Sequence, residues 1–376
     1  MKKTVVLGMS GGVDSSVAAH LLKEQGYEVI GLFMRNWDSA ANQDFLGNPT
    51  LQDETCPQEK DYQDAKKVAD HLAIRLERVD FIEEYWRDVF EYFLNEYRKG
   101  RTPNPDIMCN KYIKFDAFKK HAEMFNPDFI AMGHFARVKR NGDTLLLRGV
   151  DTGKDQTYFL SQLTEHQLAN ALFPVGELTK SEVREIAKKT NIPTADKKDS
   201  TGICFIGERH FDEFLRNYLP AKEGVIKTLS GDVIAQHVGL MHYTIGQRKG
   251  LGIGGHKDYG NAPWFVIGKD LSTNTLYAGQ GYHHEQLYST ECLLENVSAV
   301  NEKTELNGLK ITAKFRYRQK DQAVTLKQEK DGLHVYFKTP VRAVTPGQAC
   351  VFYDGDVCLG GGTINTVYKN GKKLQY

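Results

Sequence analysis

The stretch at residues 8–16, Gly-Met-Ser-Gly-Gly-Val-Asp-Ser-Ser, constrains the fold of this chain more than any other. An apolar run at 4–7 precedes it and predicts a buried strand, while apolar residues at helical spacing follow it as far as Gly26. Glycines allow a tight turn and a close approach of the backbone to a ligand, and the free N–H groups at the helix start point at that ligand. The sequence therefore predicts a strand, a glycine turn and a helix that bind an anion, most often a phosphate.

The glycine turn fits neither of two common nucleotide-binding motifs. A Walker A loop needs Gly-Lys followed by Ser or Thr, which occurs nowhere in the chain, and the turn does not read Gly-x-Gly-x-x-Gly. Ser-Gly-Gly-Val-Asp-Ser at 10–15 resembles instead the pyrophosphate loop of the ATP pyrophosphatases, which cleave ATP between its α and β phosphates. The alternative is a glycine-rich connection that binds no ligand.

Length, charge and cysteine content narrow the class of protein. A chain of 376 residues is expected to form two or three domains, and a formal net charge of +1 does not by itself indicate a nucleic-acid-binding protein. No run of eighteen apolar residues occurs and the first strand begins at residue 4, so we expect no membrane span, no targeting peptide and a cytoplasmic protein. The six cysteines form no Cys-x-x-Cys pair, and an intracellular enzyme of this size needs no disulfide framework. A cysteine that matters here should matter for chemistry.

Strands and helices alternate through the first half of the chain. Apolar runs at 29–34, 76–79 and 128–132 predict further strands, with helical patterns between them. This order is typical of a parallel sheet with helices on both faces, and ligands of such sheets bind beyond the carboxyl ends of the strands. The glycine loop, Met34, Gly133 and His134 all fall at strand ends, so one pocket is expected to hold them.

The composition changes after about residue 219. Helical periods disappear, glycines crowd residues 246–260, and short alternating runs dominate from about residue 290. The last feature predicts a terminal antiparallel β-barrel. We therefore expect three domains. Residues 1–210 should form a Rossmann-like α/β pyrophosphate-loop domain of the adenine nucleotide alpha hydrolase type, which binds ATP and is the catalytic domain. Residues 211–285 should form a small, mostly β central domain, and residues 286–376 a β-barrel domain.

Two cysteines stand in suggestive contexts. Cys109 lies three residues after Asp106, which is expected to cap a helix, and the first turn of a helix lowers the pKa of a thiol and favours the thiolate. The Asp106 carboxylate would oppose this effect if charged, but it could also relay a proton. The alternative for Cys109 is a small buried apolar residue. Cys204 stands in a Gly-x-Cys context, which alone favours a structural role.

Seven pieces of the chain, in this order, carry a resemblance to a known family. They are Gly-Met-Ser-Gly-Gly-Val-Asp-Ser at 8–15, Asn-Pro-Asp-x-x-Cys at 104–109, Gly-His-Phe-Ala at 133–136, Lys-Asp-Gln-x-Tyr-Phe-Leu at 154–160, Gly-Ile-Cys-Phe-Ile-Gly at 202–207, Tyr-Thr-Ile-Gly-Gln-Arg-Lys-Gly-Leu-Gly at 243–252 and Arg-Tyr-Arg-Gln at 316–319. With them the chain resembles the tRNA-specific 2-thiouridylase family over nearly its whole length.

This resemblance implies a reaction. The family uses ATP, with Mg²⁺, to replace the C2 oxygen of the wobble uridine at tRNA position 34 by sulfur, and it releases AMP and pyrophosphate. By resemblance, Cys204 carries a persulfide received from a sulfur-relay protein or a cysteine desulfurase. Its outer sulfur attacks C2 and Cys109 resolves the intermediate, or Cys109 first frees hydrosulfide; a Cys109–Cys204 disulfide results in either case. Asp106 is the expected proton-transfer group.

The resemblance also implies binding residues. Those expected to bind ATP are Gly8, Met9, Ser10, Gly11, Gly12, Val13, Asp14, Ser15, Met34 and Gly133. Those expected to bind the tRNA anticodon stem-loop are Asn104, Pro105, Asp106, His134, Lys154, Asp155, Gln156, Arg316, Tyr317 and Gln348. The target base must be turned out of its loop to reach the pocket. No residue is assigned to a metal.

A basic segment at 314–320 offers a surface for tRNA. Its basic residues occupy every second position, so on a strand they share one face, with Phe315 and Tyr317 on the other. The alternative is a solvated face of the barrel. Arg248 and Lys249, among glycines, are a second candidate phosphate contact.

Two other functions compete with tRNA thiolation. One is an ATP pyrophosphatase that acts on a small molecule, which would need neither the barrel nor two separated cysteines. The other is a tRNA-binding protein that uses ATP only as a conformational ligand. Release of AMP and pyrophosphate on adding tRNA would separate this second function from catalysis.

Overall fold

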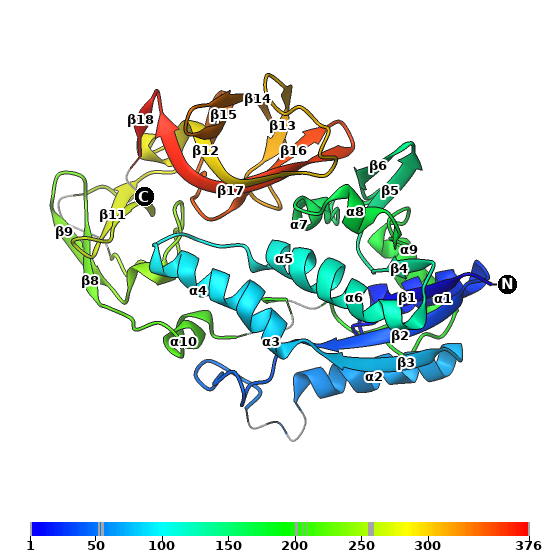
Figure 1. The fold of residues 1–376 in the computed structure, drawn as a ribbon. Coiled ribbons are helices and arrows are strands. Elements are labelled where there is room, and N and C mark those ends of the chain that lie inside the picture. Colours follow the sequence, from blue (N-terminus) through cyan, green and yellow to red (C-terminus); the bar gives the residue numbers. More distant parts are fainter. Residues whose placement is uncertain are drawn as a thin grey trace.

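The computed structural model describes residues 2–51, 53, 56–199, 202–204, 206–207, 209–254 and 259–374. Three sheets organise these residues (Figure 1): a five-stranded sheet near the N-terminus, a four-stranded sheet in the middle of the chain, and a nine-stranded sheet that includes a closed barrel. Gly255 of the predicted glycine cluster and Phe205 of the motif at 202–207 lie outside the described residues. None of the described helices is long and apolar enough to cross a membrane.

The first sheet has the strand order β3-β2-β1-β4-β7, and all of its pairs are parallel. Its strands are β1 (Thr4–Gly8), β2 (Glu28–Arg35), β3 (Arg75–Asp80), β4 (Phe129–Ala131) and β7 (Ala171–Leu172). The first four contain the runs predicted at 4–7, 29–34 and 76–79 and most of the run at 128–132. The predicted Rossmann-like parallel sheet is thus confirmed.

Helices cover both faces of this sheet because successive side chains of a strand point to opposite faces. Val5 and Leu7 of β1 pack with α1, α2 and α9, whereas Val6 packs with the helices of the opposite face. The first group is α1 (Val13–Glu24), α2 (Pro57–Leu72) and α9 (Lys180–Lys189). The second group is α3 (Ile82–Tyr85), the π-helical η1 (Trp86–Phe90), α4 (Glu91–Arg98), α5 (Pro105–Met108), the π-helical η2 (Cys109–Ala117), α6 (Phe118–Ala122) and the 3-10 turn η3 (Glu123–Phe125).

The remaining part of the N-terminal half connects the parallel sheet to the barrel. A hairpin forms between β5 and β6 around Asn141-Gly142, a residue pair that is typical of such turns, and β6 pairs with β17 of the barrel. The elements of this part are β5 (Ala136–Asn141), β6 (Asp143–Arg148), α7 (Thr157–Leu160), α8 (Glu165–Leu168) and α10 (Phe211–Arg216). A capping box of Thr179 and Glu182, whose Thr-x-x-Glu spacing can be read in the sequence, is present at the start of α9.

The middle sheet has the strand order β10-β11-β8-β9 and packs beside the barrel (Figure 1). Its elements are β8 (Gly224–Lys227), β9 (Val233–His237), η4 (Leu240–His242), β10 (Trp264–Asp270) and β11 (Thr275–Gln280), followed by η5 (Glu285–Leu287). Its core is the apolar cluster around Ile226, Val266 and Leu276. The expectation of a small, mostly β central domain is confirmed.

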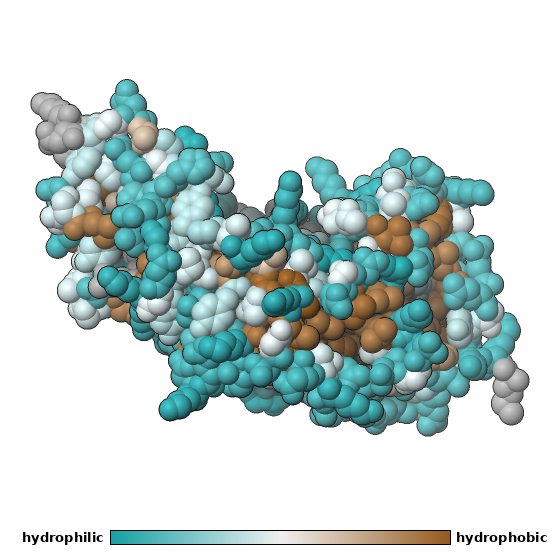
Figure 2. Space-filling model, turned by 90° about the horizontal axis from the view of Figure 1, so that it is seen from above, coloured by the Kyte–Doolittle hydropathy of each residue, from teal (hydrophilic) through white to brown (hydrophobic). Residues whose placement is uncertain are grey.

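The C-terminal barrel closes because β12 pairs with both β15 and β17. Around the barrel the order is β12-β15-β14-β13-β16-β17, and all pairs are antiparallel. The strands are β12 (Tyr288–Ala299), β13 (Lys310–Lys314), β14 (Gln322–Glu329), β15 (Gly332–Arg342), β16 (Ala349–Asp354), β17 (Val357–Lys369) and the short β18 (Lys372–Lys373). The predicted antiparallel barrel is confirmed. On the face seen in Figure 2, hydrophilic residues cover most of the surface and hydrophobic ones gather in the middle of the molecule.

One strand prediction is wrong. The basic segment at 314–320 does not continue as a strand, because β13 ends at Lys314 and the chain then turns. The Gln319 side chain closes this turn by accepting a hydrogen bond from the Phe315 backbone N–H at 3.0 Å, and Phe315 itself lies in the barrel core. Arg316 and Arg318 therefore do not share the face of one strand.

Candidate functional site

The glycine loop between β1 and α1 has a backbone conformation at Gly11 that favours glycine, and little room for a side chain at Gly8. Gly11 has φ +73°, and a Cβ there would lie 2.2 Å from the Asp61 carbonyl oxygen. A Cβ on Gly8 would lie 2.6 Å from the Met132 sulfur. Gly12 is the N-cap of α1 and no described side chain caps this end, so the first N–H groups of the helix are left for a ligand. The loop therefore has the shape and dipole of an anion site, as predicted.

The loop forms one end of a cavity of about 470 Å³. Met34 from the end of β2 and Gly133 and His134 after β4 line the same cavity, so the strand ends meet as predicted. Gly11 is the one expected ATP-binding residue that does not line it, because it packs against α2 instead.

Charged side chains flank the loop, and two of them, Lys180 and Asp199, were not singled out by the sequence. Lys180, the first residue of α9, contacts Asp14 at 2.5 Å and Asp199 at 2.8 Å, and Lys154 contacts Asp199 at 2.9 Å. Burial raises the pKa of Asp14, while hydrogen bonds from Lys180 and Lys154 outweigh partial burial and hold the pKa of Asp199 well below its usual range. Ammonium groups beside a glycine loop suit a polyphosphate. The capping box at Thr179 was the only sequence signal that could have placed Lys180.

The two candidate cysteines lie together in the structure. The Sγ atoms of Cys109 and Cys204 are 3.6 Å apart although the residues are 95 positions apart in the chain. The Cys204 backbone N–H donates to Asp106 Oδ1 at 3.3 Å, and the Tyr85 hydroxyl donates to the Cys204 carbonyl at 2.8 Å. A disulfide bond is about 2.05 Å long, so a small movement would join these two sulfurs.

The protonation state of Cys109 differs from the one expected. Asn104 rather than Asp106 is the N-cap of α5, and Cys109 lies fully buried where α5 continues into η2. Burial raises the pKa of Cys109 well above its ordinary value, so the prediction of a thiolate-prone Cys109 is wrong. The hydrogen bond from Cys109 and the charge of Lys114 instead lower the pKa of Cys204, against the effect of burial. Lys114 lines the cavity and has no sequence signal that singles it out.

His134 presents a buried nitrogen toward this region. Burial lowers its pKa well below the ordinary value, so the ring is neutral at physiological pH. Its Nδ1 atom has no hydrogen-bond partner among the residues that the structure describes. The ring is held between Phe115 and Phe173, with ring centroids 6.3 and 5.9 Å away. A buried polar atom without a partner is a group that a bound ligand can satisfy.

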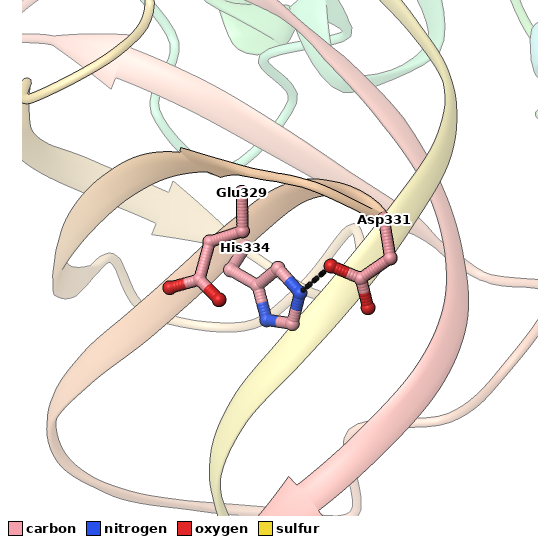
Figure 3. A group of neighbouring side chains, drawn as sticks. All are labelled: Glu329, Asp331 and His334. Atoms are coloured by element: carbon pink, nitrogen blue, oxygen red, sulfur yellow. Dashed lines mark hydrogen bonds and ion pairs between the residues drawn. The ribbon is translucent and has the colours of Figure 1, made fainter.

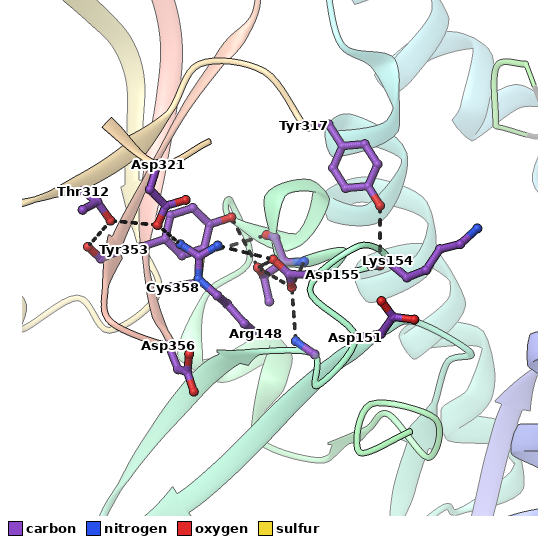
Figure 4. Close-up of polar contacts among 12 residues, drawn as sticks. Arg148, Asp151, Lys154, Asp155, Thr312, Tyr317, Asp321, Tyr353, Asp356 and Cys358 are labelled. Carbon is purple, nitrogen blue, oxygen red and sulfur yellow. Dashed lines mark hydrogen bonds and ion pairs between the residues drawn. The ribbon is translucent and has the colours of Figure 1, made fainter. Parts of the chain in front are cut away.

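Several other expected tRNA-binding residues hold the site together. Asp155 is buried, accepts hydrogen bonds from Thr157 and the Gly149 backbone, and lies 3.8 Å from the Arg148 guanidinium (Figure 4). Arg148 also contacts Asp321 of the barrel at 2.6 Å. The Asp155 carboxylate is buried and its partners lie within the protein, so it is not exposed to an RNA in this structure.

Four more of the expected tRNA-binding residues lie between the N-terminal unit and the barrel, in a region that we call the seam: Lys154, Gln156, Tyr317 and Gln348. Gln156 Oε1 accepts from the Phe135 backbone N–H at 2.9 Å. The Gln348 amide donates to the Thr102 carbonyl at 2.8 Å, next to Asn104 and Pro105. The Tyr317 hydroxyl donates to the Lys154 carbonyl at 3.5 Å, and its ring faces the cavity beside Phe159.

Arg316 lies at the junction of the middle sheet and the barrel. Its Nη2 donates to the carbonyls of Ile245 and Ala343, at 2.9 and 3.1 Å, and to the Thr345 hydroxyl at 2.9 Å. Arg318 is exposed, as are Arg248 and Lys249. Arg318, Arg248 and Lys249 are therefore exposed to solvent, whereas Arg316 joins the middle sheet to the barrel.

A group of possible metal donors lies away from the cavity on the β14–β15 hairpin, formed by Glu329, Asp331 and His334 (Figure 3). His334 Nε2 lies 3.0 Å from Asp331 Oδ1, and His334 Nδ1 lies 3.2 Å from Glu291 Oε1. Glu329 accepts from the Tyr336 hydroxyl at 2.8 Å. These hydrogen bonds occupy both ring nitrogens and account for the group as a polar network of the hairpin.

Comparison with known proteins places the whole chain. Residues 3–208 match the family model described as tRNA methyl transferase HUP domain, residues 212–280 the tRNA methyl transferase PRC-barrel domain, and residues 289–364 the aminomethyltransferase beta-barrel domain. The chain is 61% identical over 378 residues to the tRNA-specific 2-thiouridylase MnmA of Acholeplasma laidlawii, with 100% of both chains covered. It is 58% identical to the protein of that name from Listeria monocytogenes and 55% identical to that from Staphylococcus saprophyticus, with 99% of this chain and 97% and 98% of those proteins covered.

Proposed function

We infer that this chain, which belongs to the tRNA-specific 2-thiouridylase family, is an enzyme that uses ATP to replace the C2 oxygen of the wobble uridine of tRNA by sulfur. One observation carries this proposal: a single cavity is lined both by a glycine loop suited to phosphates and by Cys204, whose sulfur lies 3.6 Å from that of the buried Cys109. An ATP pyrophosphatase that acts on a small molecule would need the first feature but not the second. We propose a cytoplasmic location for the reaction.

ATP fits the end of the cavity formed by the glycine loop. The lack of a Cβ at Gly8 and Gly11 gives this loop its close turn, and Lys180 and Lys154 supply positive charge beside it. We propose that residues 8–15, Met34 and Gly133 hold ATP together with its Mg²⁺, without assigning any residue as a ligand of the metal. When bound, ATP supplies the adenylyl group that turns the C2 oxygen into a leaving group, and AMP and pyrophosphate are the products.

We propose that the target uridine enters between the two ends of the cavity. The unpartnered Nδ1 of His134 is available to the flipped base, and Asn104, Pro105 and Asp106 begin the helix that carries Cys109. Lys154, Gln156, Tyr317 and Gln348 lie where the barrel meets the catalytic unit, and we propose that this seam contacts the anticodon stem-loop. Asp155 and Arg316 are proposed to act by holding this seam in place, and Arg318 by contacting phosphate. In functional terms we divide the chain at 1–210, 211–285 and 286–376.

The two cysteines divide the sulfur chemistry. Cys204, whose pKa is lowered, is proposed to take sulfur as a thiolate from a donor persulfide, with the donor thiolate leaving. A sulfur-relay protein or a cysteine desulfurase is the proposed donor. The outer sulfur of the Cys204 persulfide then attacks C2, and Cys109 attacks the Cys204 sulfur, which forms the disulfide and leaves the outer sulfur on C2. In the other order, Cys109 releases hydrosulfide first and hydrosulfide attacks C2.

Proton transfer is needed because Cys109 is protonated at rest. Burial raises the pKa of Cys109 and also that of Asp106, which keeps a carboxyl group of raised proton affinity beside the two thiols. We propose that Asp106 accepts the proton that Cys109 must lose before it attacks.

The experiment is 2-thiouridine formation in tRNA, measured by nucleoside mass spectrometry with ATP and a sulfide source. Cys109→Ser and Cys204→Ser should each abolish product, because a hydroxyl carries no persulfide and does not attack one at neutral pH. Cys56→Ser, at an exposed thiol, should retain activity. Full activity of either of the first two variants, or a persulfide found mainly on Cys56, would show that the wrong thiols are assigned.

A further inference from the structure

Lys114 is brought to the cysteine pair by the shape of its helix. It lies five residues after Cys109 in η2. In an α-helix of about 3.6 residues per turn, residues five apart lie on different faces. The i→i+5 repeat of a π-helix brings them closer to the same face, and the Phe118 N–H follows this repeat by donating to the Ile113 carbonyl. The π-helical stretch therefore turns Lys114 toward the face that carries Cys109.

The Lys114 side chain shares the cavity with Cys204. It lines the cavity together with Asp106, Asn110 and Cys204, and its positive charge lowers the pKa of the Cys204 thiol. The same sulfur accepts the Cys109 thiol hydrogen at 3.6 Å. Cys204 thus stands between a thiol donor and a cation, while the Asp106 carboxyl and the Tyr85 hydroxyl contact its backbone.

We propose that Lys114 is a catalytic residue of the sulfur transfer, whose ammonium group holds the Cys204 sulfur in its anionic form. The proposal deepens the proposed function, on which it rests. An anionic sulfur is needed when Cys204 attacks the donor persulfide, because thiolates rather than thiols perform this exchange. The same ammonium group is placed to stabilise the negative charge that a Cys204 persulfide carries before it attacks C2.

The charge of Lys114 is maintained by its surroundings. Burial lowers its pKa, but the charges of Cys204, Cys109 and Asp106 outweigh burial and raise it above the ordinary value. A lysine that only balanced Asp106 would affect stability without setting the proton affinity of Cys204. The two roles are therefore separated by measuring the thiol itself.

The experiment is the pH dependence of iodoacetamide alkylation of the full-length protein, with each cysteine quantified by mass spectrometry and without tRNA, ATP or a sulfur donor. Lys114→Gln and Lys114→Met should shift the midpoint for Cys204 upward by about one pH unit or more, which lowers its rate near neutral pH about tenfold. Lys114→Arg should restore most of the rate. Because sulfur transfer does not take place in this assay, its outcome does not depend on whether tRNA thiolation is the correct function.

Two controls make the result specific. Lys111→Gln, on the same helix but outside the cavity, should leave the Cys204 midpoint unchanged, and the exposed Cys56 should react alike in all variants. A wild-type Cys204 midpoint above its ordinary value of 9.0 would overturn the proposal whatever the variants do. An unchanged midpoint in both neutral variants would overturn it as well.

Discussion

Lys269 of β10 has its charge buried where the middle sheet contacts the N-terminal unit. Its side chain is only 5% exposed, and its ammonium group donates to the Gly100 carbonyl at 2.9 Å. Burial lowers its pKa from 10.5 to about 7. The carboxylates of Glu96 and Glu295 are paired with the neighbouring Arg101 and not with Lys269. We predict that Lys269→Met, which keeps the length of the side chain and removes the charge, makes stability less dependent on pH.

The direction and size of this effect follow from proton binding. Because the native pKa is lowered, the unfolded state binds more protons between about pH 7 and pH 10.5, and stability from this group rises with pH across that window. The unfavourable contribution is fully present below pH 7. From pH 7 to pH 9 the two pKa values correspond to a gain of about 2.3 kcal/mol in the free energy of unfolding, which Lys269→Met should lack.

The measurement is urea unfolding at pH 7 and pH 9, read by intrinsic fluorescence, to which Trp264 on the same strand contributes. Comparing the pH difference of the variant with that of the wild type cancels all other titrating groups and the constant cost of losing the bond to Gly100. Lys222→Met, at an exposed position, is the matched control and should behave like the wild type. If Lys269→Met keeps the wild-type pH difference, then the Lys269 charge does not lower the free energy of unfolding at pH 7, and its pKa is not lowered by burial.

Four further predictions concern the glycine loop, the exposed Arg318 and the contacts around the barrel. Asp14→Ala should impair the tRNA-dependent conversion of ATP to AMP and pyrophosphate, measured by nucleotide chromatography, and formation of ADP and phosphate would contradict the proposed reaction. Arg318→Ala should weaken tRNA binding and reduce the slope of log affinity against log salt concentration by about 0.7 to 0.9, for one lost phosphate contact. Arg316→Ala should instead lower the free energy of unfolding by about 3 kcal/mol, because three hydrogen bonds are lost. Asp155→Ala should cost about 3 kcal/mol in urea unfolding because it removes a partner of the buried Arg148 charge, and a neutral result would mean that Asp321 alone suffices.

The parts of the fold that could be predicted from the sequence are those set by local periodicity. The buried strands announce themselves as apolar runs, and parallel strands place their carboxyl ends at one edge. For this reason the sequence alone assigns Met34, Gly133 and His134 to one pocket with the glycine loop. Lys180 and Asp199 carry no such signal, because they reach the loop only through the packing of α9 and the chain after it.

The basic segment after β13 shows a limit of the same reasoning. Alternation of basic and aromatic residues is what a strand requires, but it does not say where the strand ends. Phe315 is drawn into the barrel core, and the Gln319 side chain supplies the hydrogen bond that turns the chain. A side-chain bond between residues four apart has no periodic signature, so the alternation assigns Arg316 and Arg318 to one face that does not exist.

The thiols show how burial can reverse a rule that is correct for an exposed helix end. Proximity to a helix start favours a thiolate, but Cys109 is wholly buried, and the cost of burying a charge outweighs the helix dipole. Cys204, whose sequence context alone favoured a structural role, accepts the Cys109 hydrogen and is affected by the Lys114 charge. The lower proton affinity therefore belongs to the cysteine that we propose accepts sulfur first, and the proton is retained on the cysteine that we propose acts last. In the proposed sequence of steps, this order keeps Cys109 from attacking a newly loaded persulfide until its proton is removed.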